Sequence, residues 1–328
     1  MGVTVSVVIP VLNEEKYIHN LLNSLTEQDY PKDDLEIILV DGASEDNTVA
    51  LINDFIADKP YFSLLSNPQR TVQHALNIGM RAAKGKYIVR MDAHAEYACD
   101  YISMCVNTLN STDAVNVGGP MIAKGKNDVQ KVVAAAYHSP FALGGGKFHI
   151  ENYEGYADTV FLGAFRKETL EELNYYDPNL PRSEDDDLNF RVAEKGYKVY
   201  ITPKIKSVYY PRDKYSALFS QYFEYGEWKV AVIKKHKKPA RLSHLIPCLF
   251  VLFCVFGAIA SLFSCYLAIG YAFVLALYMG LNLFASFKSP YLKGAKQKLR
   301  LVLVHLILHL SYGLGFIKGI FRFMGKSF

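Results

Sequence analysis

A run of 43 residues, from Leu245 to Phe287, contains no Asp, Glu, Lys, Arg or His. As one α-helix it would be roughly 65 Å long, about twice the thickness of the hydrocarbon core of a bilayer. We therefore expect two transmembrane helices, at about 245–264 and 266–287, joined by a turn near Ser261 to Cys265. A buried hairpin inside a soluble domain is the alternative, but a globular core helix does not need so long an uncharged sequence.

A third apolar segment, at about 301–321, contains His305, His309 and Lys318. These side chains are compatible with a third transmembrane helix and also with a re-entrant or interfacial helix. The whole of 245–328 is predicted to be a membrane region, and the number of crossings in its last part stays open.

Charge is distributed unevenly along the chain. No acidic residue follows Glu227, and the segment from Leu245 onward holds eight of the 36 Lys and Arg residues, which leaves 28 basic against 32 acidic residues before it. A mildly acidic soluble part joined to a basic apolar part favours a membrane-bound enzyme over a nucleic-acid-binding protein, so no nucleic-acid partner is expected.

Basic residues flank the 43-residue run on both sides, whereas its central turn carries no charge. Loops rich in Lys and Arg stay on the cytoplasmic side of a membrane. We therefore expect a multi-pass protein of the inner or plasma membrane, with its amino-terminal domain in the cytoplasm. A third crossing would place Arg322 and Lys326 outside, against this rule.

The first 213 residues are predicted to form one α/β domain. Val3–Pro10 is a nearly continuous run of β-branched residues, as expected of a parallel strand buried on both faces. Further strands and helices alternate after it, which predicts a Rossmann-like, doubly wound, mostly parallel sheet. The further strands are expected at 35–40, 64–66, 86–91 and 114–118, and the helices at about 13–26, from Thr48 onward, at about 71–83 and near 96–109.

Acidic residues stand at three places in this domain. Asp41 and Asp92 each follow a short apolar run, and four consecutive carboxylates, Glu184 to Asp187, open a predicted helix. The carboxyl ends of strands in an α/β sheet are where such folds bind ligands. The pattern therefore predicts a crevice for a nucleotide, a metal ion and a general base.

Residues 214–244 are predicted to form an amphipathic helix with a basic linker. Leu218, Phe219, Tyr222 and Phe223 share one stripe of this helix, and its end is rich in Lys. Such a helix can lie at the membrane surface or pack on the soluble domain, and the sequence does not separate these two possibilities.

Five segments in order resemble the motifs of family 2 glycosyltransferases. The combination of Asp-Ala-His with Gly-Ala-Phe-Arg is most similar to the exopolysaccharide glucosyltransferases of the succinoglycan type. The resemblance covers about residues 1–230 and implies a GT-A fold. It also implies a metal-dependent, inverting glycosyltransferase that uses a UDP-sugar. The five segments are Val7–Glu14, Leu39–Thr48, Ala75–His94, Phe161–Arg166 and Glu184–Leu188.

The resemblance implies a set of residues that bind the nucleotide sugar. Asp41 would accept a hydrogen bond from the uracil N3–H, although an Asp before Gly42 also forms turns. Arg70 would contact the diphosphate, unless it is a solvated loop residue. The full expected set is Pro10, Asn13, Glu14, Asp41, Arg70, Asp92, Gly163, Glu184, Trp228 and Lys229.

Asp92 and His94 occupy the outer positions of what is usually an Asp-x-Asp metal motif in this family. A carboxylate suits Mg²⁺, and an imidazole in the last position shifts the preference toward Mn²⁺. The expected cofactor is therefore Mn²⁺ or Mg²⁺. A hydrogen-bonded surface histidine is the alternative for His94.

Asp185 is the expected catalytic base. An inverting transfer needs one carboxylate that takes the proton from the acceptor hydroxyl as the hydroxyl attacks the anomeric carbon. Repulsion within the acidic run would raise carboxylate pKa values, and Arg182 together with an Asp187–Arg191 pair would oppose that effect. The alternative for Asp185 is a solvated acidic helix start that the helix dipole stabilises.

The expected reaction is transfer of a hexose, with glucose favoured, to a polyprenyl-diphosphate-linked saccharide in capsule or exopolysaccharide assembly. Gln221–Lys229 stands where processive synthases of the family carry Gln-x-x-Arg-Trp, but the Arg-Trp pair is missing at that spacing. Trp228 and Lys229 are nevertheless expected near the leaving diphosphate, unless Trp228 anchors its helix at the interface. A processive polysaccharide synthase and a non-catalytic UDP-sugar-binding scaffold are the alternatives.

Overall fold

The computed structural model describes residues 2–239 and 241–326, and these form two compact units. Unit 1 contains the chain up to Ile122 together with Lys147–Tyr209. Unit 2 contains Ala123–Gly146 and the chain from Tyr210 onward. The three domains expected from the sequence stay a prediction, because compactness alone does not separate an interface helix from membrane helices.

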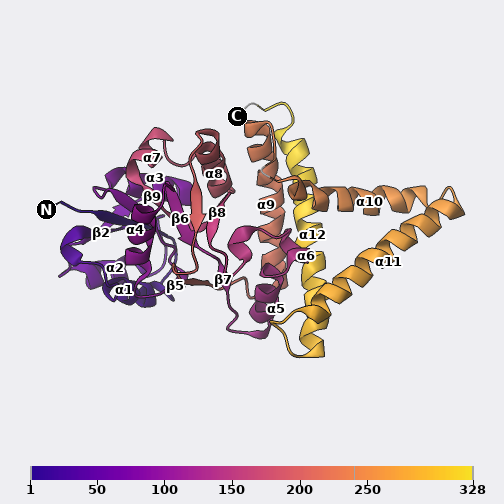
Figure 1. Ribbon diagram of the computed structural model, residues 1–328, viewed down its shortest axis with the longest axis horizontal. Helices are drawn as coiled ribbons and strands as arrows, with labels where there is room; N and C mark the ends of the chain where they lie inside the picture. Colours follow the sequence, from indigo (N-terminus) through magenta and orange to yellow (C-terminus); the bar gives the residue numbers. More distant parts are fainter. Residues whose placement is uncertain (1, 240, 327–328) are drawn as a thin grey trace. The chain divides into compact units, whose positions relative to one another are not determined.

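The core of unit 1 is an eight-stranded sheet with the order β3-β2-β1-β4-β9-β6-β10-β8 (Figure 1). Its strands are mostly parallel, but β9 is antiparallel to both of its neighbours and β8 is antiparallel to β10. The predicted α/β fold with a doubly wound, mostly parallel sheet is confirmed. The strands are β1 Val5–Val11, β2 Leu35–Asp41, β3 Phe62–Ser66, β4 Tyr87–Arg90, β6 Asn116–Gly119, β8 Gly155–Ala157, β9 Phe161–Arg166 and β10 Val199–Ile201.

Helices cover both faces of this sheet. On β1, Val7 and Ile9 belong to one apolar core and Val8 to the other, so the strand is apolar at successive positions because both of its faces are buried. The helices of unit 1 are α1 Ile18–Thr26, α2 Thr48–Ile56, α3 Val72–Ala82, α4 Tyr101–Ser111, α7 Lys167–Glu172 and α8 Glu184–Glu194.

Two predicted helices begin later than expected. The helix expected near 96–109 begins only at Tyr101, because Ala95–Tyr97 forms a strand, β5, that pairs with β11, Ser207–Tyr209. The helix expected from Asn13 begins at Ile18, because backbone groups of residues 13–15 bond to the loop after β2 instead. In both places a partner far away in the sequence overrides the local preference for helix.

Unit 2 is helical. It contains three helices that are long and apolar enough to cross a membrane, as judged by length and composition: Leu242–Ala260, Cys265–Lys288 and Ala295–Phe323. The predicted turn near Ser261 to Cys265 is confirmed, since α10 ends at Ala260 and α11 begins at Cys265. The helices of unit 2 are α5 Asp128–Tyr137, α6 Pro140–Leu143, α9 Tyr215–His236, α10 Ile246–Ala260, α11 Cys265–Lys288 and α12 Ala295–Phe323.

Candidate active site

The loops that follow β1 and β2 are joined by hydrogen bonds between backbone and side chains. The Asn13 amide donates to Ser44 Oγ at 2.9 Å, and the Glu45 amide donates to Asn13 Oδ1 at 2.8 Å. The Glu14 amide donates to Thr48 Oγ1 at 2.7 Å. The first two predicted motifs therefore form one continuous structure, which we name the motif loops (residues 12–15 and 42–48).

Asp41 lies at the end of β2 and is buried beside the motif loops. Its two carboxylate oxygens accept from the Ser44 amide at 3.3 and 3.2 Å, so the turn-forming role of this residue is present. Each oxygen has a further lone pair that can accept from a ligand. Pro10 pairs with Val40 on the neighbouring strand, and Arg70 forms an ion pair of 2.6 Å with Glu45 of the motif loops.

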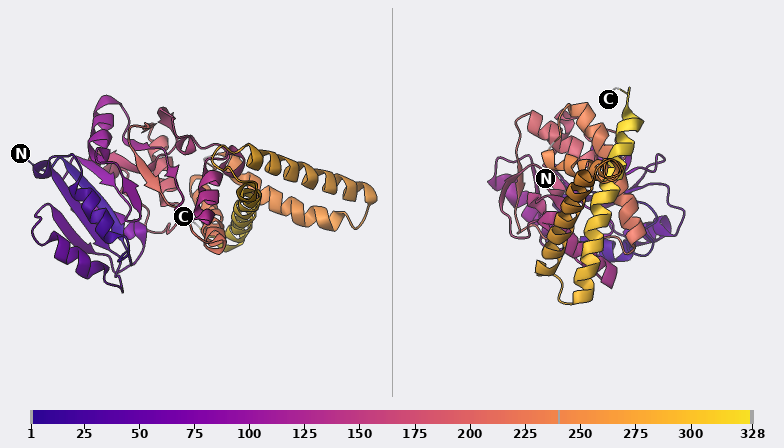
Figure 2. Two further views of the ribbon diagram at one scale, coloured as in Figure 1. Left: turned by 90° about the horizontal axis from the view of Figure 1, so that it is seen from below. Right: turned by 90° about the vertical axis from the view of Figure 1, so that its right-hand side faces the viewer.

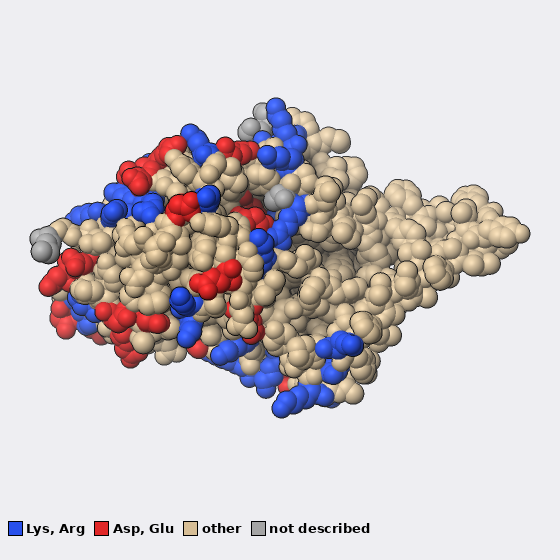
Figure 3. All heavy atoms as spheres, viewed as in Figure 1, with Lys and Arg blue, Asp and Glu red and all other residues tan. Residues whose placement is uncertain are grey.

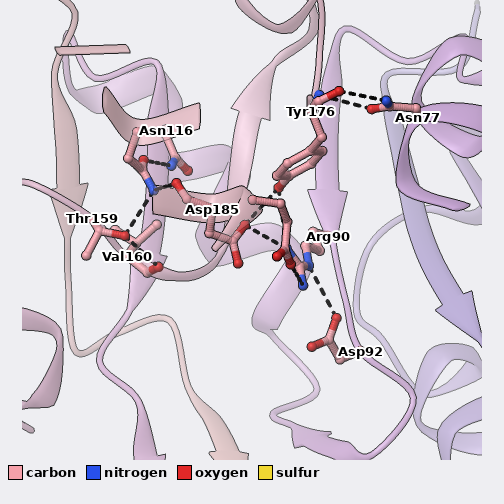
Figure 4. Close-up of polar contacts among 10 residues, drawn as sticks. Asn77, Arg90, Asp92, Asn116, Thr159, Val160, Tyr176 and Asp185 are labelled. Atoms are coloured by element: carbon pink, nitrogen blue, oxygen red, sulfur yellow. Dashed lines mark hydrogen bonds and ion pairs between the residues drawn. The ribbon is translucent and has the colours of Figure 1, made fainter. Parts of the chain in front are cut away.

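Arg90, the last residue of β4, is the centre of a charged cluster that sequence reasoning did not identify. Its side chain is only 6% exposed, and its guanidinium lies 2.7 Å from Asp185, 3.3 Å from Asp92 and 3.7 Å from Glu184 (Figure 4). The phenol of Tyr176 donates to Asp185 Oδ1 at 3.1 Å. We name these five residues the Arg90 cluster. It brings together two of the acidic positions that were predicted to share a crevice.

The beginning of α8 is held in place by two further contacts. The predicted pair of Asp187 and Arg191 is confirmed at 2.9 Å, and Arg191 also donates to the Tyr175 carbonyl at 2.7 Å. Asn77 of α3 exchanges two hydrogen bonds, of 2.8 and 3.0 Å, with the backbone of Tyr176 (Figure 4). The ring of Tyr176 and the first turn of α8 are thereby fixed relative to β4.

Burial changes the acidity of the two carboxyl groups at the start of α8. It raises the pKa of Glu184 to about 7, with a further contribution from the charge of Asp185 and opposition from Arg90. Although 44% of the Asp185 side chain is exposed, desolvation by the surrounding protein also raises its pKa; Arg90 opposes this shift and Asp92 adds to it. A carboxylate whose pKa is raised toward neutrality is a better proton acceptor at physiological pH.

Asp92 and His94 lie just beyond β4, at the same edge of the sheet as the Arg90 cluster. His94 Nδ1 is 3.7 Å from Glu14 Oε1, and the imidazole is 49% exposed. No group of three or more His, Cys, Asp or Glu side chains placed to hold a metal occurs within residues 2–239 and 241–326. The donor set of one carboxylate and one imidazole fits Mg²⁺ or Mn²⁺ if diphosphate oxygens complete the coordination.

Gly163 lies on β9. Its φ is +87°, and a Cβ atom would come within 2.7 Å of Asn116 Oδ1. Asn116 donates to Asn189 of α8 at 3.1 Å, and Asn189 donates to the Asp185 carbonyl at 2.9 Å. A glycine is therefore needed here for the packing that supports α8, and its predicted contact with a nucleotide sugar stays a prediction.

Trp228 and Lys229 lie on α9 in unit 2. The Trp228 ring packs on Phe323 at 5.2 Å and lies under the Arg322 guanidinium at 4.8 Å, and Lys229 is buried. The predicted role of both residues at the leaving diphosphate stays a prediction.

The doubly wound sheet, with acidic residues at or just after the carboxyl ends of β2 and β4, agrees with the GT-A fold that the five sequence motifs predict. Comparison with known families agrees, because the model described as "Glycosyl transferase family 2" matches residues 6–173, half of the chain. The chain belongs to glycosyltransferase family 2.

Two curated relatives are similar over most of the chain. The succinoglycan biosynthesis protein ExoA of Rhizobium meliloti (strain 1021) is 28% identical over 97% of this chain and 95% of its own length. A Methanococcus voltae enzyme is 28% identical over 70% of this chain and 74% of its own. Its name is dolichyl N-acetyl-alpha-D-glucosaminyl phosphate 3-beta-D-2,3-diacetamido-2,3-dideoxy-beta-D-glucuronosyltransferase.

A solved structure shares the fold. The mannosyltransferase PcManGT from Pyrobaculum calidifontis, in complex with GDP-mannose and Mn²⁺, superposes with a TM-score of 0.65 at 21% identity. The match covers 93% of this chain and 86% of that chain. S. aureus TarS in complex with UDP-GlcNAc gives a TM-score of 0.50 at 16% identity, over 97% of this chain and 91% of that chain.

Proposed function

We propose that this glycosyltransferase is an inverting, metal-dependent enzyme that transfers a hexose, with glucose favoured, from a UDP-sugar to a polyprenyl-diphosphate-linked saccharide. The observation that carries the proposal is the Arg90 cluster, in which Asp185 is held by Arg90 and Tyr176 near Asp92. Support comes from Asp185, a partly exposed carboxylate with a raised pKa that shares Arg90 with Asp92, one of the two expected metal ligands.

Asp185 acts as the general base in this proposal. Both the Arg90 and the Tyr176 contacts are made to Oδ1, so Oδ2 is the oxygen that accepts the proton from the acceptor hydroxyl. The acceptor oxygen forms a bond to the anomeric carbon while the bond from that carbon to the diphosphate oxygen breaks. One such displacement inverts the anomeric configuration and needs no covalent intermediate.

The motif loops and the residues around them bind the donor. Asp41 accepts from the uracil N3–H, Pro10, Asn13 and Glu14 line the base and ribose, and Arg70 is directed to the diphosphate. Asp92 and His94 hold a divalent cation, which supplies positive charge to the departing UDP when it is bound. Support comes from the Mn²⁺ in the mannosyltransferase structure and the UDP-GlcNAc in the TarS structure.

Glu184, Gly163, Trp228 and Lys229 are assigned secondary roles. Glu184 is proposed to bind the nucleotide sugar, and it lies 3.7 Å from the guanidinium of Arg90. Gly163 supports the first turn of α8 through Asn116. Trp228 and Lys229 are proposed to assist the leaving diphosphate.

The names of the relatives favour a lipid-linked acceptor in polysaccharide assembly. One relative takes part in succinoglycan biosynthesis, and the other carries a dolichyl phosphate saccharide in its name. The apolar helices of unit 2 would keep such an enzyme at the membrane that contains its acceptor, with unit 1 in the cytoplasm.

The test is metal-dependent release of UDP by detergent-purified protein from a panel of UDP-sugars, with and without the polyprenyl-linked acceptor. The expected result is turnover that requires one donor, the acceptor, and Mg²⁺ or Mn²⁺, with an inverted anomeric centre in the product. Long polymer made from UDP-sugar alone would indicate a processive synthase, and UDP binding without turnover would indicate a scaffold.

The metal site has its own test. Asp92→Ala is expected to abolish turnover, whereas His94→Asp keeps it because a carboxylate replaces the imidazole as a ligand. Equal and mild losses in both variants would refute this site.

A further inference from the structure

The backbones of α9 and α12 are in direct contact. A Cβ atom added at Gly315 would lie 1.9 Å from the Phe223 carbonyl oxygen, and one added at Gly319 would lie 2.4 Å from the Glu227 carbonyl oxygen. These contacts advance by the same number of residues along both helices, so α9 and α12 run in the same direction. Such approach is possible only with glycine at the contact points. Figure 1 shows the two helices side by side.

Ion pairs and a hydrogen bond also join α9 to the last turns of α12. Glu227 of α9 is only 3% exposed and pairs with Lys318 at 3.0 Å and with Arg322 at 2.6 Å. Lys234 of α9 donates to the Phe323 carbonyl at 2.6 Å and so caps the end of α12. We name these two helices the α9–α12 pair, because backbone contacts, ion pairs and a hydrogen bond join them.

The charge of α9 restricts where the pair can lie. The 22 residues of α9 include Glu224, Glu227, Lys229, Lys234 and Lys235. If the apolar stretch 301–321 of α12 crossed the bilayer, the contacts between the helices would carry the first three of these charges into the hydrocarbon core. Charged side chains are strongly unfavourable there.

The helices α10 and α11 have a different orientation and a different environment from α12. In the left view of Figure 2 they extend together to one side, while α12 is seen almost along its axis. Half of the apolar window of α12 is buried by other helices, compared with 11% for Leu242–Ala260 and 6% for Cys265–Lys288. If this exposed hairpin follows the membrane normal, α12 lies in the plane of the membrane.

Basic residues occur near both ends of α12, whereas the α10–α11 hairpin carries none before Lys288, the last residue of α11. Figure 3 shows the hairpin as a projection without Lys or Arg, with basic residues gathered at its foot. A crossing helix would put one basic end outside, against the positive-inside rule, whereas a helix in the plane keeps both ends inside. The basic residues are Lys288, Lys293, Lys296, Lys298 and Arg300 at one end, and Lys318, Arg322 and Lys326 at the other.

We propose that the α9–α12 pair lies along the cytoplasmic surface of the membrane, and that the α10–α11 hairpin alone crosses it. The partner of the pair is the headgroup layer, whose anionic phosphates face the basic ends of α12 while its apolar side chains enter the acyl boundary. This inference rests on the membrane anchoring that the proposed function includes.

The native cysteines provide a direct test in the full-length chain. Cys99 in unit 1 and Cys265 at the start of α11 are both exposed. A membrane-impermeant maleimide would be applied to intact cells and, separately, to lysed cells that express the Lys326→Cys variant. Each labelled peptide would be quantified by mass spectrometry. We expect Cys265 to be labelled in intact cells, and Cys99 and the cysteine at position 326 to be labelled at least tenfold more after lysis.

Two outcomes would overturn the inference in different ways. Labelling at position 326 in intact cells, with Cys99 protected, would show that α12 crosses the membrane, while the proposed glycosyl transfer would be unaffected. Protection of Cys265 in intact cells would show that the hairpin does not cross, and would refute the anchoring as well. UDP release measured on the same membranes reports the proposed reaction independently of either result.

Discussion

The Arg90 cluster of unit 1 and the ion pairs of Glu227 in unit 2 are opposite in charge. In unit 1 one buried cation faces three carboxylates, at 2.7, 3.3 and 3.7 Å. In unit 2 one buried carboxylate faces two cations, Lys318 and Arg322, at 3.0 and 2.6 Å. Each cluster therefore has an excess of one sign that its own residues do not neutralise.

The sign of the excess indicates what each cluster binds. Negative charge in excess must be balanced by protons or by a cation, and perturbed carboxylates of this kind are concentrated at functional sites. If the α9–α12 pair lies at the membrane as proposed, lipid phosphate would balance its excess positive charge. Under the two proposals, the same arrangement of one charge among several of opposite sign would serve the chemistry in unit 1 and the attachment to the membrane in unit 2.

The largest effect is expected from Asp185→Asn. This change removes the proton acceptor but keeps the shape of the side chain, so turnover should fall by roughly 10²- to 10⁴-fold. UDP affinity should stay within about twofold, because the motif loops are not affected. UDP release and isothermal titration with UDP measure the two quantities.

Asp186→Asn is the matched control for that change. Asp186 lies on the same turn of α8 and is not a member of the Arg90 cluster. Its substitution should leave turnover nearly unchanged. Equal losses in the two variants would show that the acidic run acts only as a helix start.

Arg90→Met tests whether the cluster depends on its one cation. The variant leaves three carboxylates without their counter-ion, which should cost about 3–5 kcal/mol of stability. Loss of Arg90 also raises the pKa of Asp185, since this arginine opposes the upward shift. Any remaining activity should therefore require a higher pH, so the acidic limb of the pH–rate profile shifts to higher pH.

Thermal melting and a pH–rate profile measure these two effects. Arg81→Met on α3 is the control, because that exposed arginine contacts Asn174 and the ring of Tyr175 and is not a member of the Arg90 cluster. An unchanged acidic limb in Arg90→Met would contradict the proposed coupling between Arg90 and the base.

Glu227→Gln tests the opposite cluster. The variant leaves Lys318 and Arg322 without their carboxylate, but these side chains are 54% and 43% exposed, so water screens them. The melting temperature should fall by a few degrees, equivalent to about 1–2 kcal/mol. UDP affinity should not change. A loss of UDP affinity larger than the loss of stability would show that Glu227 belongs to the donor site.

A pH dependence of stability is expected at Glu184. Its folded pKa of about 7 lies above its usual value of 4.5, so the folded state binds its proton more tightly. This contribution to stability is complete below pH 4.5 and is lost as the pH rises through 7. The Glu184→Gln variant should therefore have the same free energy of unfolding as the wild type at pH 5. At pH 8 its free energy of unfolding should be higher than that of the wild type by about 1–3 kcal/mol. Equal differences at both pH values would contradict the shift.

Local sequence signals predicted the central strands and the acidic residues that follow them. Val5–Val11 and Leu35–Asp41 each contain a run of consecutive apolar residues because both faces of the sheet are covered, and that pattern is visible in the sequence. The strand at 95–97 was not visible, because its stability depends on pairing with β11 much later in the chain. The packing of residues 123–146 with the last helices depends on distant partners in the same way.

In the candidate site too, some features could be predicted from the local sequence and others depend on distant contacts. An arginine between Val89 and Met91 in a buried strand was a detectable signal, since a buried cation needs partners. Which carboxylates serve as partners depends on the position of α8, and that position is set by Asn77 and by the Asp187–Arg191 pair. These contacts join segments that share no local pattern.

Residues 123–146 have a consequence for the synthesis of the chain. The His309 imidazole Nε2 donates to the Phe141 carbonyl at 3.0 Å across 168 residues of sequence, and Arg300 pairs with Asp128 at 3.7 Å. A nascent chain is made from its amino terminus, so α5 and α6 emerge from the ribosome long before α12 exists. The apolar faces of α5 and α6 therefore lack this partner until α12 has been translated. A prematurely terminated product that lacks α12 would leave these faces uncovered.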